Sequence, residues 1–211
     1  MATEREFKSD VAETFVLPDL DGVAGLRASD RGVRRLDAVY WDTDELRLMH
    51  SGFGLRHRTT DGGAVVWTLK GGTHREGDAV VRDEFEVPGT ADVIPAELAA
   101  RVAAVTAIAD VHPVAHLHTA RHVVDLDDGE RRWAEVADDT VSVLRGDRLV
   151  HTFREVEVEL TAAGEGTAQD ARAAQVLAAL REAGAGQPSS SSKYVRALRA
   201  LGYDVGAAAA D

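Results

Sequence analysis

The chain of 211 residues carries 24 Lys and Arg against 36 Asp and Glu, and this formal charge of −12 disfavours a nucleic-acid-binding surface. It contains no cysteine, which excludes disulfides and thiolate chemistry, and together with the absence of a signal-like N-terminus this favours a cytoplasmic protein. No stretch approaches the ~18 consecutive apolar residues of a membrane helix, so we expect no membrane span.

In chain order, the pattern predicts eight strands, mostly linked by hairpins, with helices between them. The strands are expected within residues 1–10 and at 34–42, 53–60, 65–70, 79–87, 114–126, 132–143 and 149–160. Helices are expected at 17–27 with Asp19 as cap, in a short turn after Leu46, and at 94–109, 169–183 and 193–201. The strand at 65–70 should end at Gly71-Gly72, before a loop over 73–77. We expect a single domain over residues 1–203 and a disordered tail over 204–211.

Charged side chains alternate with apolar ones along several of these strands. Successive side chains of a strand point to opposite faces, so Glu4, Glu6 and Lys8 share one face and Phe7 lies on the other. The charged faces together hold Glu4, Glu6, Lys8, Arg56, Arg58, Lys70, Arg82, Glu84, Glu86, Arg121, Glu155, Glu157 and Glu159. In a flat sheet these charges would lie in water as weak surface pairs.

A curled sheet would instead turn the charges inward and form a barrel with an ionic lining. Two features favour the barrel: Ser, Thr, Asn and Gln are scarce among these positions, and arginines and glutamates are segregated on different strands. Enclosed charges are costly unless they are paired or bind a ligand of opposite charge. A polyphosphate with divalent cations would neutralise both the bases and the acids of the lining. We therefore predict an α+β fold, an eight-stranded antiparallel β-barrel (tunnel) with a charged interior and helices packed outside.

The ordered set of motifs resembles the CYTH domain of the triphosphate tunnel metalloenzyme superfamily. The motifs are Glu4-x-Glu6-x-Lys8, Tyr40-Trp41-Asp42-Thr43, Leu55-Arg56-x-Arg58, Thr68-Leu69-Lys70-Gly71, Arg82-x-Glu84-x-Glu86, Arg121, Ala137-Asp138-Asp139, the segment 155–160, and Ser192-Lys193-Tyr194. They follow the family's order from Glu4 to about Tyr203. The resemblance implies the same barrel and a metal-dependent hydrolysis of a triphosphate, often inorganic tripolyphosphate, to diphosphate and phosphate.

The resemblance also implies roles for individual residues. Phosphate oxygens would be bound by Lys8, Arg56, Arg58, Lys70, Arg121 and Lys193, with Arg82 more an ion-pair partner than a direct ligand. Mg²⁺ or Mn²⁺ would be held by Glu4, Glu6, Glu157 and Glu159, with Asp138 completing the set. The choice among Glu155, Glu157 and Glu159 stays open, as does that of Asp138 over Glu135 or Asp139. Lys8, Glu84 and Glu86 would form the catalytic group, with the two glutamates orienting the basic residues, holding a second metal or acting as base.

Other functions compete with this prediction. An adenylate cyclase or thiamine triphosphatase of the same superfamily needs room for a base or a thiamine ring, and the five Phe, three Trp and three Tyr form no distinctive cluster. A non-catalytic polyphosphate-binding module, partner of a histidine-rich CHAD domain, would be expected to lose the metal-binding glutamates. Since acids and bases are both present, we favour the enzyme. A CHAD-domain protein and a homodimer both stay open as partners.

Histidines and serines stand outside these motifs. His116 and His118 share a strand face, which invites a zinc-site interpretation, but no classical spacing supports it. We therefore expect these two, with His112 and His122, to be surface imidazoles on the outer wall. The four serines at 189–192 are expected to cap the final helix.

Overall fold

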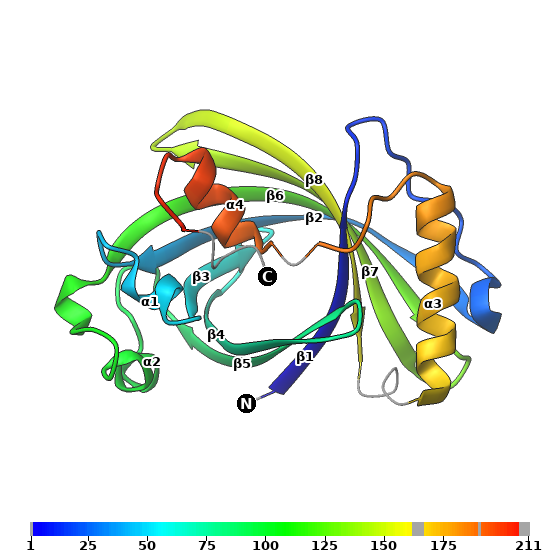
Figure 1. The fold of residues 1–211 in the computed structure, drawn as a ribbon, viewed down its shortest axis with the longest axis horizontal. Helices are drawn as coiled ribbons and strands as arrows, with labels where there is room; N and C mark the ends of the chain where they lie inside the picture. Colours follow the sequence, from blue (N-terminus) through cyan, green and yellow to red (C-terminus); the bar gives the residue numbers. More distant parts are fainter. Residues whose placement is uncertain (1, 162–166, 190, 207–211) are drawn as a thin grey trace.

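The computed structural model describes residues 2–161, 167–189 and 191–206. Eight strands close into an antiparallel barrel in the order β1-β5-β4-β3-β2-β6-β7-β8 (Figure 1). They are β1 (Ala2–Asp10), β2 (Arg27–Asp42), β3 (Gly54–Thr60), β4 (Val65–Glu76), β5 (Ala79–Gly89), β6 (His112–Asp127), β7 (Arg132–Arg145) and β8 (Arg148–Leu160). The predicted fold class and the eight-stranded antiparallel barrel are confirmed.

The helices are α1 (Arg47–His50), α2 (Ala96–Val102), α3 (Thr167–Glu182) and α4 (Lys193–Ala200), with 3₁₀ turns at Val23–Gly25 and Ile108–Asp110. Helices α2 and α3 lie outside the strand wall (Figure 1), whereas α4 packs against side chains that face the interior of the barrel. In the described part of the chain, no helix is both long and apolar enough to cross a membrane.

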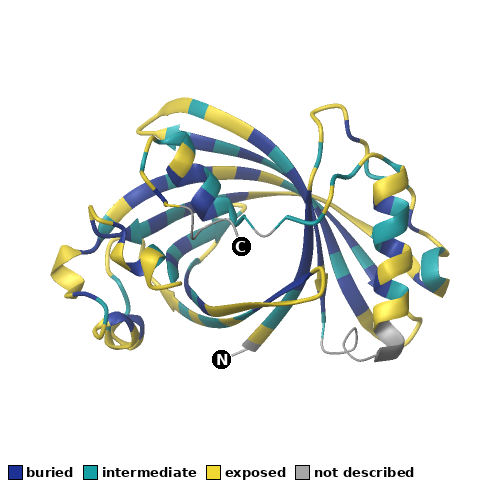
Figure 2. Cartoon of the chain, in the orientation of Figure 1, coloured by how far each residue is buried: buried dark blue, intermediate teal, exposed yellow. Residues whose placement is uncertain are grey.

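The apolar faces of the strands point outward and are covered by helices. Phe7 of β1 and Val158 of β8 belong to a buried cluster with Val176 and Leu180 of α3. Trp67 of β4 is buried in a second cluster, against α2. The alternation of buried and exposed positions along the strands is visible in Figure 2. Since side chains alternate across a strand, this outward apolar face leaves the charged face of each strand to the interior.

Helix α4 packs against interior-facing apolar side chains. Its buried Val195 and Leu198 share a cluster with Leu117 of β6 and Val143 of β7. Ser192 caps the helix, because its side chain accepts a hydrogen bond from the backbone N–H of Val195. The predicted cap is thereby confirmed for Ser192, whereas Ser190 lies outside the described residues.

Two predictions near glycines were wrong. Residues 17–27 form no α-helix, because Gly22 adopts a positive φ of 79° and only a 3₁₀ turn follows. Asp19 accepts a hydrogen bond from the N–H of Asp21, as in an Asx turn, and does not cap a helix. Strand β4 does not end at Gly71, since a register shift between Gly71 and His74 lets its pairing with β5 continue to Glu76.

The helix expected over 94–109 and the tail expected over 204–211 also differ from their predictions. The helix expected over 94–109 is interrupted after Val102 and resumes only as the turn Ile108–Asp110. The predicted disordered tail was wrong at Val205, which is buried in the α4 cluster with 5% of its surface exposed. Residues 207–211 of that tail lie outside the described residues.

Candidate functional site

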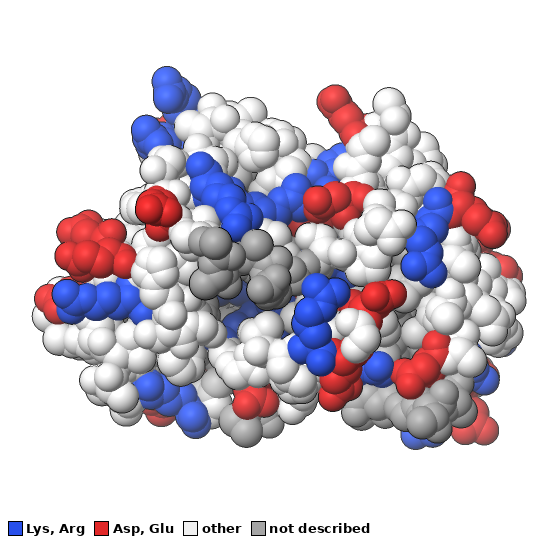
Figure 3. Space-filling model, viewed as in Figure 1, with Lys and Arg blue, Asp and Glu red and all other residues white. Residues whose placement is uncertain are grey.

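The barrel encloses a cavity of about 560 Å³, lined by side chains from all eight strands and from the start of α4. Its charged lining comprises Glu4, Glu6, Lys8, Arg34, Arg56, Arg58, Lys70, Arg82, Glu84, Glu86, Arg121, Glu135, Glu157, Glu159 and Lys193. Figure 3 shows basic side chains in and around the recess near the middle of one face, with acidic ones beside it. The structure thus brings together every site residue expected from the sequence except Asp138.

One wall of the cavity is acidic. Glu6 of β1 is the register partner of Glu159 of β8, and Glu159 is in turn the partner of Glu135 of β7. Three carboxylates therefore stand in a row across three neighbouring strands. Such a row offers hard oxygen donors of the kind that Mg²⁺ and Mn²⁺ prefer.

Beside this row, Glu4 is held in a buried group of ion pairs. Lys70 Nζ lies 2.7 Å from Glu4 Oε2 and 2.9 Å from Glu84 Oε1. Arg82 Nε lies 3.1 Å from the same Glu4 oxygen, and Arg82 also pairs with Glu6. Burial by itself would raise the pKa of Glu4, but Lys70 and Arg82 lower it to about 2, so Glu4 is ionised at neutral pH.

A second group of ion pairs lies where α4 enters the barrel. Lys193 Nζ contacts Asp139 Oδ2 at 2.9 Å and Glu157 Oε1 at 2.8 Å, and it also contacts Glu155. Arg121 Nη2 lies 2.7 Å from both Asp139 and Glu157. Burial opposes the charge on Lys193, yet the surrounding carboxylates raise its pKa above the usual value.

These carboxylates also bear on the open choice among the three glutamates of β8. Oxygens of Asp139, Glu155 and Glu157 lie within 4.8 Å of one another, a spacing that suits a cation. The Lys193 ammonium already occupies that position. Glu155 is also bound by Arg196 at 3.0 Å and does not line the cavity, whereas Glu157 and Glu159 do.

The opposite wall carries cations without carboxylate partners. Among the described residues, no carboxylate oxygen lies within 4.0 Å of a guanidinium nitrogen of Arg56 or Arg58 on β3. Arg56 Nη1 instead lies 3.3 Å from the hydroxyl of Tyr40. The positive charge of Arg56, followed by burial, lowers the pKa of Arg58 to about 10. Two arginines with no anion between them form a site that lacks negative charge.

Two carboxylates of the cavity, Glu86 and Glu159, likewise have no oppositely charged partner among the described residues. Within the described ranges, neither Glu86 nor Glu159 has a Lys or Arg nitrogen within 4.0 Å, and Glu86 only accepts a hydrogen bond from Thr68. Glu159 reaches solvent in the lumen but is largely surrounded by protein, and this burial, followed by the charge of Glu4, raises its pKa to about 7. Since β3 and β8 are four strands apart in the closed barrel, Glu159 and the two arginines lie on different sides of one cavity. Glu86 on β5 is only two strands from β3, and its charge partly opposes the fall in the pKa of Arg58.

The prediction for Asp138 was wrong in its placement. Asp138 points away from the cavity, and its carboxylate oxygens lie 2.9 and 2.8 Å from Arg154 Nη2. Arg154 also donates to the backbone carbonyls of Glu13 and Phe15, so this pair fastens the loop after β1 to the outer wall. Asp139 and Glu135, one and three residues away, belong to the opposite, inward face.

Arg34 also lines the cavity, from β2, as the register partner of Arg121, and was not among the site residues expected from the sequence. No carboxylate within 4.0 Å balances it among the described residues. Its strand face continues through Leu36, Ala38 and Tyr40 and therefore lacks the alternation that marked the other charged faces. A count of inward positions from Tyr40 back to residue 34 would have found it.

The fold and the site together define a class of closed antiparallel barrels with an inward ionic lining. The chain belongs to the CYTH domain family, whose model matches residues 2–195. An uncharacterised protein of Mycobacterium tuberculosis, found in two strains, is 31% identical over 93% of this chain. The chain spans 40% of the length of these relatives.

Solved structures share the fold. A Hippeastrum protein, HpAC1, named as an adenylyl cyclase with a dominant triphosphatase activity, aligns with a TM-score of 0.61 at 18% identity, over 95% of this chain and 97% of that one. A Bacillus halodurans protein named as an adenylate cyclase aligns with a TM-score of 0.60 at 17% identity, over 93% and 98%. The Pyrococcus horikoshii protein PH1819 aligns with a TM-score of 0.59 at 17% identity, over the same shares. At these identities the likeness concerns the fold.

Proposed function

We propose that this domain is a divalent-metal-dependent triphosphatase that hydrolyses inorganic tripolyphosphate inside the barrel. The observation that carries the proposal is the placement of unpaired arginines and unpaired carboxylates in one cavity. A polyanion neutralises the first group and a divalent cation the second, and a metal–triphosphate complex supplies both. Membership of the CYTH family and the triphosphatase activity ascribed to the Hippeastrum protein support this assignment.

The aromatic side chains of the cavity favour a small inorganic substrate over a nucleotide. Tyr40 and Tyr194 stack on each other with ring centroids 4.6 Å apart and an angle of 4° between their planes. The hydroxyl of Tyr194 donates to Asp42 at 2.8 Å, and that of Tyr40 contacts Arg56. Phe53 is packed against the backbone at Gly71. These rings are therefore engaged within the protein and offer no obvious platform for a base.

The donor set of the cavity fits a hard divalent cation. Glu4, Glu6 and Glu159 would hold it, with Glu135 next in the row and Glu157 beside it, and all are oxygen ligands. Glu159, with its raised pKa, marks a place where negative charge is not compensated by the protein. When bound, the metal would neutralise phosphate oxygens and polarise the terminal phosphoryl group.

The residues of this chain would then divide the chemistry among them. Arg56 and Arg58 bind phosphate oxygens and stabilise the charge of the transferring group, joined by Lys8, which lies 3.7 Å from Glu6. Glu86, free of any ion pair among the described residues, accepts a proton from the attacking water. A bond forms from that water oxygen to the terminal phosphorus as the bridging P–O bond breaks, releasing diphosphate. Glu84 positions Lys70 at 2.9 Å.

Phosphate release from a panel of substrates tests the proposal. Tripolyphosphate, ATP, thiamine triphosphate and pyrophosphate are each supplied with Mg²⁺ and with Mn²⁺. We expect tripolyphosphate to be preferred and the reaction to stop in chelator. Glu6→Ala and Lys8→Ala are each expected to remove activity, while both variants stay folded by circular dichroism.

The matched control is Arg148→Ala, which removes a cation from an exposed position at the start of β8. It should leave the rate unchanged. Normal turnover in Glu6→Ala and Lys8→Ala would contradict the site assignment. Tight binding of long polyphosphate without phosphate release under either metal would show a binding module instead, and pyrophosphate release from ATP would show a cyclase.

A further inference from the structure

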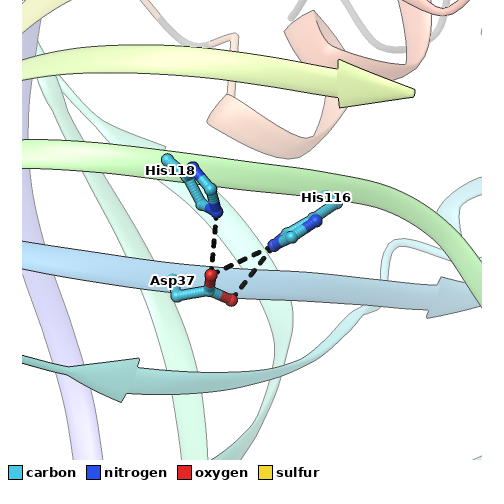
Figure 4. A group of neighbouring side chains, drawn as sticks. All are labelled: Asp37, His116 and His118. Carbon is cyan, nitrogen blue, oxygen red and sulfur yellow. Dashed lines mark hydrogen bonds and ion pairs between the residues drawn. The ribbon is translucent and has the colours of Figure 1, made fainter. Parts of the chain in front are cut away.

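A histidine and aspartate cluster lies on the outer wall, on the face of β6 opposite to Arg121. Asp37 of β2 is the register partner of His118 of β6, and the neighbouring Val39 is the partner of His116. All three polar side chains converge at one point between the two strands (Figure 4). The sequence predicted the outer-wall position of the histidines but not this third residue, since Asp37 lies far away in the chain.

The separations between the donor atoms match those of a metal coordination shell. His118 Nε2 lies 2.9 Å and His116 Nε2 3.1 Å from the Asp37 carboxylate oxygens. One donor atom from each of the three residues lies within 4.8 Å of the other two. In a tetrahedral zinc site with bonds of ~2.0–2.1 Å, neighbouring donor atoms are about 3.3 Å apart. Small side-chain rotations would therefore convert the hydrogen-bonded cluster into a coordinating one.

We propose that Asp37, His116 and His118 form a binding site for Zn²⁺ that is separate from the tunnel. Two neutral imidazoles and one carboxylate suit zinc, whereas the all-carboxylate wall of the tunnel suits harder cations. The three side chains expose 47%, 34% and 54% of their surface, so a metal can enter from solution and solvent can supply the remaining ligand. Bound Zn²⁺ would link β2 to β6 on the outside of the barrel.

The same surface offers a matched control. His122 Nε2 lies 2.9 Å from Asp30 Oδ1, also between β6 and β2, but this pair has one histidine and no third ligand among the described residues. A pair with two protein ligands holds zinc weakly. Substitution of Asp30 should therefore leave zinc binding by Asp37, His116 and His118 unchanged.

Calorimetric titration with ZnCl₂ tests the site, in phosphate-free buffer with excess Mg²⁺ to occupy the tunnel carboxylates. We expect one tight Zn²⁺ equivalent in the unmodified protein. Since loss of a ligand's supporting contacts alone weakens metal sites ~10–100-fold, Asp37→Asn and His118→Gln should each weaken this equivalent at least ~10-fold. Asp30→Asn should retain it. Co²⁺ in place of Zn²⁺ should give the visible absorption of a nitrogen-ligated ion in the unmodified protein and lose it in His118→Gln.

Two results would overturn the proposal: no tight zinc equivalent in the unmodified protein, or one that is unchanged in both variants. The second result would place the metal elsewhere, as in the tunnel. Thermal unfolding in chelator shows whether each variant is folded, and two independent variants guard against misfolding of either one. Triphosphatase activity in Mg²⁺ is expected to be unchanged in Asp37→Asn, because Asp37 does not line the tunnel.

Discussion

At the scale of single residues, the cavity is defined by charges that the protein leaves unbalanced. Most of the lining is already paired, as with Lys193 among three carboxylates and Lys70 between Glu4 and Glu84. Arg58 is different, because the largest effect on its pKa comes from another cation, Arg56, which lowers it. An enclosed charge without an opposite charge beside it lowers the stability of the fold, and such charges are found where they bind a ligand.

This imbalance predicts opposite effects on stability and activity for Arg58→Met. Removal of an unpaired, largely enclosed cation should stabilise the ligand-free protein by about 1 kcal/mol. The same change should lower kcat/KM for tripolyphosphate by ~10²–10³-fold, as loss of a charge-stabilising donor does elsewhere. Urea unfolding in chelator and steady-state kinetics measure the two quantities. A variant that is less stable and fully active would refute the assignment of Arg58 to the substrate.

Glu159 predicts a pH dependence of stability in the metal-free protein. Its pKa rises from about 4.5 unfolded to about 7 folded, so the folded state binds the extra proton between these values. The contribution of Glu159 to the free energy of unfolding is fully present below pH 4.5 and is lost as pH rises through 7. Glu159→Gln should therefore be more stable than the unmodified protein at pH 8 and similar at pH 4.5, as measured by urea unfolding in chelator. Equal stability differences at both pH values would show that Glu159 does not titrate in this range.

At the scale of elements, each strand carries two different surfaces, and the helices act on both. Helix α3 covers the apolar outer side of β1 and β8, which allows the charged sides of those strands to face inward. Helix α4 instead brings a charged residue to the cavity, since Lys193 is its first residue and contacts Glu155 and Glu157. The outer helix stabilises the wall, and the second contributes to the site.

The cap of α4 therefore affects both stability and substrate binding. Ser192→Ala removes the acceptor for the Val195 N–H and should cost about 1 kcal/mol in the free energy of unfolding. Because Lys193 follows directly, we also expect a higher KM for tripolyphosphate. Ser191→Ala is the control, since the Ser191 hydroxyl accepts a 3.3 Å hydrogen bond from Arg199 and, among the described residues, caps no helix. An unchanged KM in Ser192→Ala, together with the stability loss, would show that the position of Lys193 does not depend on the cap.

The sequence could predict the elements where charge and apolar character alternate strictly. Glu155 to Glu159 have that alternation, and Glu4 to Lys8 depart from it only at Arg5. Both strands turn these acids inward as expected. Alternation does not show which side chain points inward where two adjacent residues are of the same kind. Asp138 and Asp139 lie on opposite faces, and only the register with β8, where Asp139 pairs with Glu155, tells which one points inward.

The other differences between the predicted and the observed structure have their cause in the backbone or in contacts between distant parts of the chain. The positive φ of Gly22 ends the predicted first helix, and the bulge after Gly71 keeps β4 paired where glycines suggested a loop. Burial of Val205 depends on α4 and could not be predicted from a short tail rich in alanine. Likewise, the zinc-type cluster needs Asp37 from a strand paired with β6, a contact that spacing within one strand does not show.

At the scale of the whole molecule, the barrel is an inside-out arrangement: apolar faces outward under helices, and ionic faces inward around one cavity of about 560 Å³. We propose that a triphosphate and a divalent cation neutralise the unpaired charges of that interior. A crystal structure with Mn²⁺ and a non-hydrolysable imido analogue of tripolyphosphate tests this claim most directly, with anomalous scattering locating the metal.

We expect phosphate oxygens at Arg56 and Arg58 and manganese among the carboxylates of Glu4, Glu6 and Glu159. An analogue bound to the outer surface, with the cavity still holding only its own ion pairs, would contradict this proposal.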